Sequence, residues 1–110
     1  FRGGLQIFDK TTETFETYKS DENDSLTINS NNLMSLEWVN DDTLLIGTYG
    51  GGLNLFDLKN KQFSAITETE GLVNNVVYGV LYQGNGKCWL STNNGIVQYD
   101  IYTKSFVNFK

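Results

Sequence analysis

The sequence predicts an all-β protein built from a repeated four-stranded unit, on three observations. A hexamer that ends in an aromatic residue and Asp occurs three times, beginning at Gly4, Gly52 and Gly95. A longer block that leads into the hexamer occurs twice, beginning at Asn31 and Asn75. Within these blocks apolar residues follow the two-residue period of strands, and no stretch shows helical periodicity of useful length. Repeats at this spacing usually mean stacked supersecondary units.

Each complete repeat is expected to supply four antiparallel strands separated by turn clusters such as Asn40-Asp41-Asp42 and Gly84-Asn85-Gly86. The first repeat gives strands at 33–39, 44–48, 53–57 and 62–67. The second repeat gives strands at 77–83, 88–92, 96–100 and 105–110. The second strand of each repeat is almost continuously apolar, which is typical of a strand buried on both faces.

The first strand of each repeat, here called the inner strand, shows the same alternation of apolar residues in both repeats. Met34, Leu36 and Trp38 alternate along the first inner strand. The second inner strand has the same alternation, at Tyr78, Val80 and Tyr82. We therefore expect each set of three to share one side of its strand.

Four antiparallel strands per repeat, with a period in the forties, describe the blade of a β-propeller. The chain 1–110 is then part of one propeller domain, with a partial blade at 4–19, a complete blade at 32–67 and a complete blade at 76–110. Because a propeller closes only with several blades, we expect a fragment of a longer protein whose partners are the remaining blades of that parent propeller. Exposed faces and strand edges also favour a homodimer or association of fragments.

Composition limits the class of partner. The net charge is −5 at pH 7 and the eight basic residues are scattered, which argues against a surface for nucleic acid or anionic lipid. No apolar run reaches membrane-spanning length and no signal peptide is visible, so we expect a membrane connection only through the parent protein. The single cysteine, Cys88, lies in a buried strand, where core packing explains it.

The run from Leu45 to Asp57, preceded by the Asn-led segment from Asn31 to Leu36, resembles the two-component regulator propeller repeat. That repeat has an Asn-led inner strand, then Leu-Trp-Ile-Gly-Thr, then Gly-Gly-Leu, then an aromatic residue and Asp. The run from Trp89 to Ile96 resembles it again, with Ser in place of one Gly. The resemblance covers nearly the whole chain.

The resemblance implies a seven-bladed propeller in the periplasmic sensor region of a hybrid two-component histidine kinase of Bacteroidetes, an inner-membrane protein. Such sensors detect breakdown products of complex polysaccharides. The implied function is ligand sensing and signalling by a non-catalytic segment without a cofactor, with an oligosaccharide as ligand. The sequence departs from the repeat at three positions: Leu45 stands where the repeat has Trp, and Val39 and Gln83 stand where it commonly has Asp before the inner hairpin.

The residues that could carry catalysis have simpler explanations. Asp9, Asp57 and Asp100 occur once per repeat before a hairpin, so an Asx turn accounts for them, and residues on separate blades cannot form the paired carboxylates of a glycosidase. The sequence has no His, so it offers neither a Ser-His-Asp relay nor an imidazole metal site. The stretch 21–24 is explained as a solvated loop and 50–52 as a tight turn. We predict no catalytic and no metal-binding residues.

Because successive strands run in opposite directions, their order predicts which loops lie together, and so where a ligand would bind. Loops from fourth to first strand, and from second to third strand, must emerge on one side of the molecule. They carry Arg2, Tyr49, Asn93 and Asn94, which we predict as ligand-binding residues because aromatic rings cover the apolar face of a sugar while amides satisfy hydroxyl groups. Asn31 and Asn75 recur at equivalent positions and are explained as turn caps.

Two other functions stay open. The chain could belong to a secreted propeller enzyme that acts on polysaccharides, with catalytic groups on other blades, or to a structural propeller that serves as an interaction platform. Flanking sequence would discriminate between them. We also expect Trp89 to be buried where two blades meet.

Overall fold

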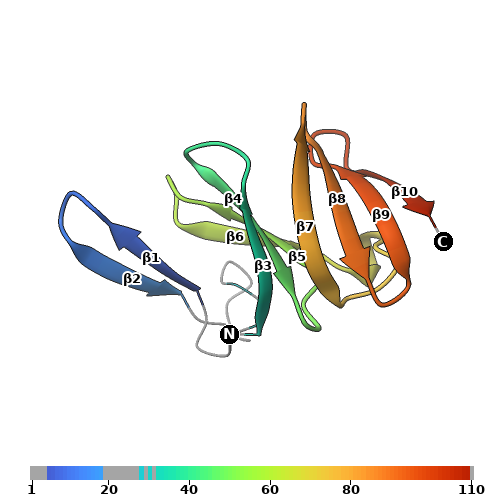
Figure 1. Ribbon diagram of the computed structural model, residues 1–110, viewed down its shortest axis with the longest axis horizontal. Coiled ribbons are helices and arrows are strands. Elements are labelled where there is room, and N and C mark those ends of the chain that lie inside the picture. The colour runs from blue at the N-terminus through green and yellow to red at the C-terminus, as the bar shows by residue number, and fades with distance from the viewer. Residues whose placement is uncertain (1–4, 19–27, 29, 31, 110) are drawn as a thin grey trace.

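The structure is a computed structural model that describes residues 5–18, 28, 30 and 32–109. These residues form a hairpin and two four-stranded antiparallel sheets (Figure 1). The hairpin consists of β1 (Leu5–Asp9) and β2 (Thr14–Tyr18). The first sheet consists of β3 (Leu33–Trp38), β4 (Thr43–Thr48), β5 (Leu53–Asp57) and β6 (Gln62–Ile66). The second sheet consists of β7 (Val77–Gly84), β8 (Lys87–Thr92), β9 (Gly95–Asp100) and β10 (Ser105–Phe109).

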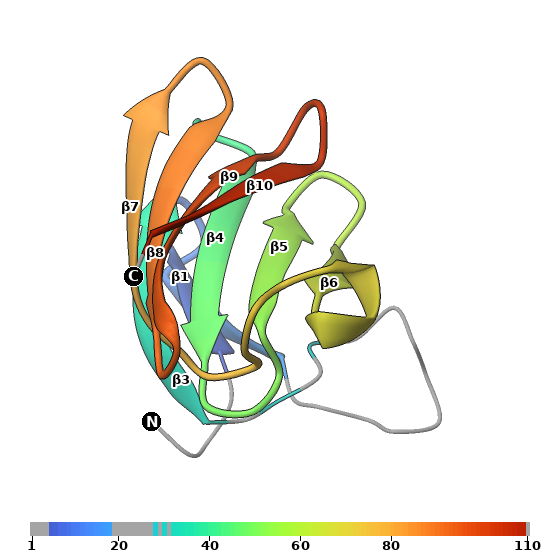
Figure 2. The same ribbon diagram turned by 90° about the vertical axis from the view of Figure 1, so that its right-hand side faces the viewer.

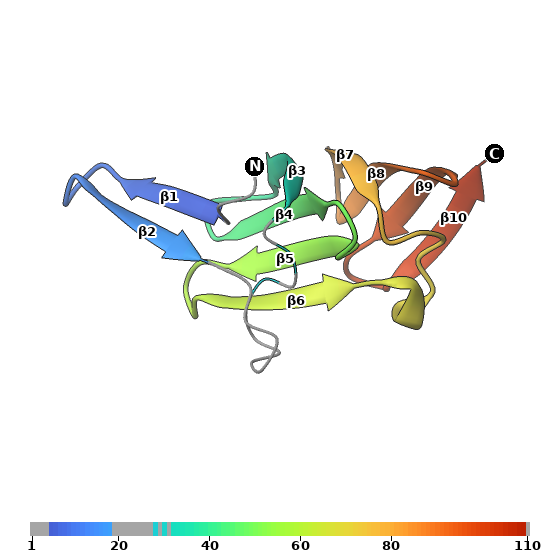
Figure 3. The ribbon, with the colours of Figure 1, turned by 90° about the horizontal axis from the view of Figure 1, so that it is seen from below.

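The hairpin, the first sheet and the second sheet lie side by side in chain order (Figure 3). In each sheet the strands follow one another in chain order, so β3 and β7 are inner strands that lie close together, while β6 and β10 are outer strands. This arrangement confirms the predicted all-β fold, a propeller fragment with two complete blades and the last two strands of a preceding one.

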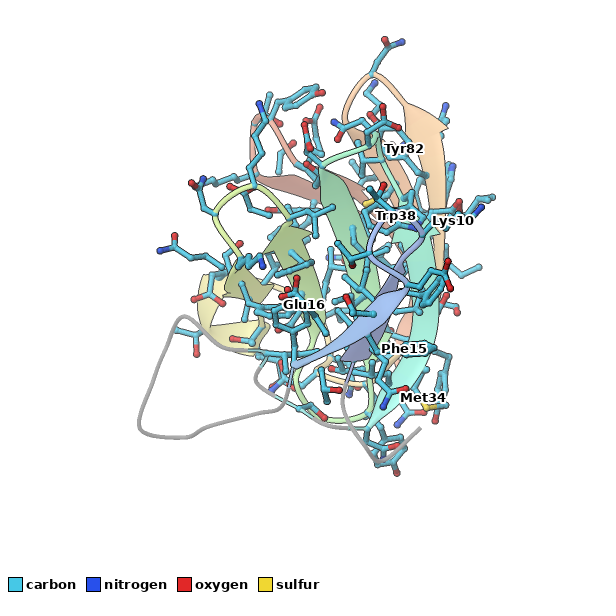
Figure 4. The ribbon with its side chains drawn as sticks, turned by 90° about the vertical axis from the view of Figure 1, so that its left-hand side faces the viewer. Lys10, Phe15, Glu16, Met34, Trp38 and Tyr82 are labelled. Carbon is cyan, nitrogen blue, oxygen red and sulfur yellow. The ribbon has the colours of Figure 1, made fainter. Side chains whose placement is uncertain are left out.

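One apolar core lies between the hairpin and the first sheet. Tyr18 packs its ring on Phe56 and Phe63 at centroid distances of 4.7 and 5.7 Å, and those two rings stack at 4.4 Å. The buried apolar members of this core are Leu5, Ile28, Leu33, Leu44, Ile46, Phe56 and Phe63. The hairpin covers only part of the sheet, and Trp38 and Met34 on β3 stay exposed beside it (Figure 4).

A second core lies between the two sheets. Its buried members are Leu45, Leu53, Ile66, Leu72, Val77, Val80, Cys88, Leu90, Val97 and Tyr99. Since β4 contributes Leu45 to this core and Leu44 and Ile46 to the other, it is buried on both faces, as its apolar run predicted. In β8, by contrast, Cys88 and Leu90 are buried and Trp89 is only half-buried.

The two inner strands do match each other, but the prediction that their three alternating residues share one side is wrong, because each inner strand contains a bulge at the same place. Leu33 pairs with Thr48 and Ser35 pairs with Gly47, so Met34 is an extra residue. Tyr78 is the corresponding extra residue between Val77 and Gly79. A bulge reverses the side on which the following residues lie. Tyr78 is therefore exposed, whereas Val80 is buried against the first sheet.

The inner ends of the two sheets approach closely. A Cβ atom on Gly47 would lie 2.8 Å from the carbonyl oxygen of Val77, so the second sheet fits only because this residue is glycine. The Ser35 hydroxyl accepts a hydrogen bond of 3.2 Å from the main-chain N–H of Val80. This hydrogen bond joins the inner strands of successive sheets.

Trp89 does not lie between the two sheets. It points to the outer face of the second sheet, where its ring packs on Phe109 at 5.5 Å, and it is half-buried. The expected burial of Trp89 is thus not reached within this chain, because no described residue covers that face (Figure 2).

A short 3-10 helix that the sequence did not predict, Glu68–Glu70, precedes β7. Its capping box joins Thr67 and Glu70, and the hydrogen bonds from the Thr67 main chain and hydroxyl lower the pKa of the Glu70 carboxyl. Glu68 and Asn75 exchange two hydrogen bonds, from the Glu68 N–H to the Asn75 side chain (2.7 Å) and from the Asn75 N–H to the Glu68 carboxylate (3.0 Å). These contacts hold the connection from the first sheet to the second.

Candidate functional site

The candidate site lies along one end of the sheets, here called the lower edge because it is lower in Figure 1. The lower edge consists of the β4–β5 turn (49–52), the connection 67–76 and the β8–β9 turn (93–94). The opposite end, the upper edge, carries the hairpin turns 39–42, 58–61, 85–86 and 101–104. The predicted strand parity is therefore correct for the described loops.

Two threonine side chains, Thr48 (buried) and Thr92 (half-buried), shape the two turns of the lower edge. The Thr48 hydroxyl donates to the carbonyl oxygen of Gly52 (2.8 Å) and accepts from the N–H of Gly51 (2.9 Å). Thr92, the counterpart of Thr48, donates to the Gly95 carbonyl oxygen (2.8 Å) and accepts from the N–H of Asn94 (3.0 Å). The repeated Thr thus fixes the turn, while the residues that follow it are left to vary.

Main-chain hydrogen bonds join the β4–β5 turn to the connection that leads into β7. The Asn75 carbonyl oxygen accepts from the N–H groups of both Gly50 (3.1 Å) and Gly52 (2.7 Å). The N–H of Tyr49 donates to the Asn32 carbonyl oxygen (2.9 Å), and Tyr49 also forms an isolated bridge with Val76. The backbone beneath the Tyr49 side chain is therefore held from both sides.

An aromatic and amide cluster, consisting of Tyr49, Tyr78 and Asn93, lies on this edge. The rings of Tyr49 and Tyr78 meet edge to face, with 6.5 Å between centroids and 66° between planes. The Tyr78 hydroxyl donates to the Asn93 side-chain oxygen. Tyr49 is 51% exposed and Tyr78 is 40% exposed, so both rings offer surface to a ligand while their positions are fixed by each other and by Asn93.

This cluster can bind a molecule that has both apolar and hydroxyl-bearing surfaces. Exposed aromatic rings provide apolar area at a small cost in side-chain entropy. The amide nitrogen of Asn93 can donate, and a phenol oxygen can both donate and accept. Such a combination suits the apolar face and hydroxyl rim of a pyranose ring.

The structure places three of the four predicted ligand-binding residues. Tyr49 and Asn93 belong to the same cluster, linked through Tyr78. Asn94 is exposed in the adjoining turn, where its N–H supports the turn. Arg2 lies outside the described residues, as does Asn31. Asn75 is a turn residue, which agrees with its explanation from the sequence.

Sequence reasoning missed Tyr78, because an unbroken strand pattern assigned it to the same side as Val80. The signal that could have found it is the position of Tyr78 as the second residue of its strand, at the place where Met34 stands in the preceding repeat. Only the bulge directs this side chain to the lower edge.

The repeated Asp residues act in turns where their side chains are described. The Asp57 carboxylate accepts from the Asn60 amide (2.7 Å) and from the Lys59 N–H (3.0 Å), and these bonds, led by that of Asn60, lower its pKa. Asp100 accepts from the N–H groups of Thr103 (3.1 Å) and Tyr102 (2.9 Å), which lower its pKa in the same way. Both are Asx turns on the upper edge. The side chain of Asp9 lies outside the described part of the chain.

The described residues contain no group of three or more Cys, Asp or Glu side chains placed to hold a metal ion. Within the same residues no helix has the length and apolar character needed to cross a membrane.

Comparison with solved structures shows the fold. The chain superimposes on the extracellular domain of BT3049, a proposed hybrid two component system from B. thetaiotaomicron, with a TM-score of 0.88 and 18% identity over 99% of this chain. It also superimposes on two structures of the extracellular domain of BT4673 from B. thetaiotaomicron, described once as a one component and once as a hybrid two component system. Both have a TM-score of 0.80, with 17% and 19% identity over 98% of this chain.

In each case the chain spans 16% of the solved protein. No protein-family model matches the sequence, and no curated protein matches it either. The structural likeness therefore establishes that the repeats adopt the fold found in these extracellular domains.

Proposed function

We propose that this chain is a non-catalytic segment of an extracellular sensor region, and that its lower edge binds an oligosaccharide derived from a polysaccharide. The observation that carries the proposal is the cluster of Tyr49, Tyr78 and Asn93, which presents aromatic and amide groups on a rigidly held edge. Recognition there would be passed to a histidine kinase in the same parent protein, anchored in the inner membrane with its sensor region in the periplasm.

Two lines of support lead to a sensor. The solved structures of the same fold are extracellular domains of proposed one component or two component systems. The sequence also resembles the two-component regulator propeller repeat over nearly its whole length. Asp57 and Asp100 are engaged in turns on the upper edge, away from the cluster, which favours binding over catalysis.

The test uses the complete extracellular region of the encoded protein and calorimetric titration with a panel of defined oligosaccharides. For an oligosaccharide that binds, Tyr49→Ala should weaken binding by about tenfold, since loss of one stacked ring removes about 1 kcal/mol or more. Tyr78→Phe should weaken it less, because the ring is kept and only the hydroxyl that orients Asn93 is lost.

Tyr102→Ala is the matched control, because Tyr102 is 70% exposed and lies in the β9–β10 turn of the upper edge. A second control is Asn85→Gly, since Asn85 has a φ of 53°, which glycine adopts without strain. Neither control should change binding. Loss of binding in the controls with retention in Tyr49→Ala would show that the wrong edge has been assigned.

A further inference from the structure

The two edges of the molecule differ in charge. The basic side chains that the structure describes all lie in or beside turns of the upper edge: Lys10, Lys59, Lys61, Lys87 and Lys104. Lys10 belongs to the β1–β2 turn, which corresponds to the β5–β6 turn of the first repeat (Figure 4). The described lower edge has no basic residue and carries two exposed carboxylates, Glu68 and Glu70. The other segments predicted for this edge, 1–3 and 20–31, add one basic and three acidic residues in the sequence.

Glu68 is held beside the turn that carries Tyr49. Its carboxylate accepts a hydrogen bond of 3.0 Å from the N–H of Asn75. The carbonyl oxygen of the same Asn75 accepts from the N–H groups of Gly50 and Gly52 in the β4–β5 turn. The negative charge of Glu68 is therefore connected to the ligand-binding turn through a single residue.

The main-chain N–H groups of the β4–β5 turn are already occupied. A glycine-rich turn can cradle an anion when its N–H groups point outward. Here the N–H groups of Gly50 and Gly52 donate to the Asn75 carbonyl oxygen, at 3.1 and 2.7 Å. The N–H of Gly51 donates to the Thr48 hydroxyl at 2.9 Å. All three glycine N–H groups thus have partners within the protein, so this turn is not an anion site.

The N–H groups of the 3-10 helix are occupied as well. That of Glu68 donates to the Asn75 side-chain oxygen (2.7 Å). That of Thr69 donates to the Thr67 hydroxyl (3.2 Å), and that of Glu70 donates to the Thr67 carbonyl oxygen (3.0 Å). The connection between the two sheets therefore presents its carboxylates to solvent, while these amides are turned inward.

The aromatic and amide cluster offers only uncharged groups to a ligand. The Asn93 side-chain oxygen accepts from the Tyr78 hydroxyl, which leaves the amide nitrogen as a donor. Amides and phenols suit sugar hydroxyl groups, whereas carboxylate and sulfate groups are bound most strongly by charged donors such as Arg. An anionic sugar would lose hydration at this edge and gain no charged donor from the described residues.

We propose that the lower edge selects neutral oligosaccharides and rejects those that carry a carboxylate or sulfate group, and that Glu68 and Glu70 contribute to the rejection by their charge. The inference rests on the proposed function, since it concerns the specificity of the same site. Like charges placed against an unwanted ligand raise specificity without adding a contact to the correct one.

The experiment is calorimetric titration of the complete extracellular region with matched pairs of trisaccharides. Trisaccharides of glucose, mannose and galactose are each compared with the trisaccharide of the corresponding uronic acid. In a pair that binds, the neutral member should have a dissociation constant at least tenfold lower than the uronate. The difference should narrow when NaCl is raised from about 50 mM to about 500 mM, because salt screens the repulsion.

Two variants test the part played by charge. Glu68→Gln keeps a side-chain oxygen that accepts from the Asn75 N–H but removes the negative charge. It should tighten uronate binding about twofold, the effect of one charge roughly 8 Å away in water, and leave binding of the neutral sugar unchanged. Asp41→Asn is the matched control, because it removes one exposed carboxylate from the upper edge. It should change neither dissociation constant.

A uronate that binds as tightly as its neutral counterpart, and that loses affinity in Tyr49→Ala, would overturn the inference and leave the proposed function standing. An equal gain in uronate affinity from Asp41→Asn and Glu68→Gln would also overturn it, because the effect would then come from net charge alone. Absence of binding by every sugar in the panel would refute the proposed function, and the inference with it.

Discussion

The two four-stranded sheets have the same repeat and the same strand order, yet their second strands are buried differently. In β4, Leu44, Leu45 and Ile46 are all at most 2% exposed, because the hairpin covers one face and the second sheet covers the other. In β8, Cys88 and Leu90 are buried while Trp89 and Ser91 face outward. The comparison shows that the burial of a position in this repeat depends on the neighbouring sheet as much as on the residue itself.

The largest expected effect compares Leu45 with its counterpart Trp89. Leu45→Ala should lower the free energy of unfolding by about 2–5 kcal/mol, because it leaves a cavity between two packed sheets. Trp89→Ala removes more atoms but should cost less in this chain, since the Trp89 side chain is only half-buried. Urea unfolding measures the loss in free energy of unfolding for both variants. A larger loss for Trp89→Ala than for Leu45→Ala would contradict the assignment of Trp89 to the outer face.

Gly47→Ala should lower the free energy of unfolding by about 1–3 kcal/mol, the usual cost of overpacking. The new methyl group would lie 2.8 Å from the Val77 carbonyl oxygen, a main-chain atom that cannot move without displacing β7. Ser91→Ala at the counterpart position is the control and should change the stability of the 110-residue chain little. If the two variants unfold at the same urea concentration, the close approach of the two sheets has been wrongly assigned.

Cys88 allows a comparison by pH, because its counterpart Leu44 cannot ionise. Burial, assisted by Asp100, raises the pKa of the Cys88 thiol from 9.0 to about 12. The folded chain therefore keeps a proton that the unfolded chain releases, so this contribution to stability is complete below pH 9 and is lost as the pH rises toward 12. The difference in unfolding midpoint between the natural chain and Cys88→Ala should shrink over that range. A constant difference would show that the thiol is accessible to water.

The smallest effect is expected on the upper edge. Lys59 lies 4.0 Å from Asp42 with 75% of its side chain exposed. Lys59→Ala should change the free energy of unfolding by no more than about 0.5 kcal/mol, because exposed ion pairs contribute little. Thermal unfolding measures the melting temperatures of Lys59→Ala and Leu45→Ala. If both variants lower the melting temperature by a similar amount, this turn is part of the core.

The sequence predicted the eight strands of the two complete repeats to within one residue at each end, because the repeats could be aligned with each other and the turns contain Gly, Asn and Asp at matching positions. It predicted the wrong sides for the inner strands, since a bulge at Met34 or Tyr78 leaves no mark in the alternation of apolar residues. For the same reason, only part of the candidate site could be predicted. Tyr49 and Asn93 follow from loop parity, whereas the contribution of Tyr78 depends on the bulge.

The Asn75 carbonyl oxygen accepts hydrogen bonds from two N–H groups of the β4–β5 turn, and this has a consequence for how ligand specificity changes. The β4–β5 turn is held to the next sheet by main-chain hydrogen bonds, while the buried Thr48 and Asn54 fix the shape of the turn itself. The side chain at position 49 adds an exposed edge-to-face contact with the ring of Tyr78. Replacement at this position, or at position 93 in the β8–β9 turn, alters the surface contacts with Tyr78 but leaves the main-chain hydrogen bonds of the β4–β5 turn in place. Each repeat supplies one such turn, so the ligand contacts of a chain built from these repeats can change one turn at a time.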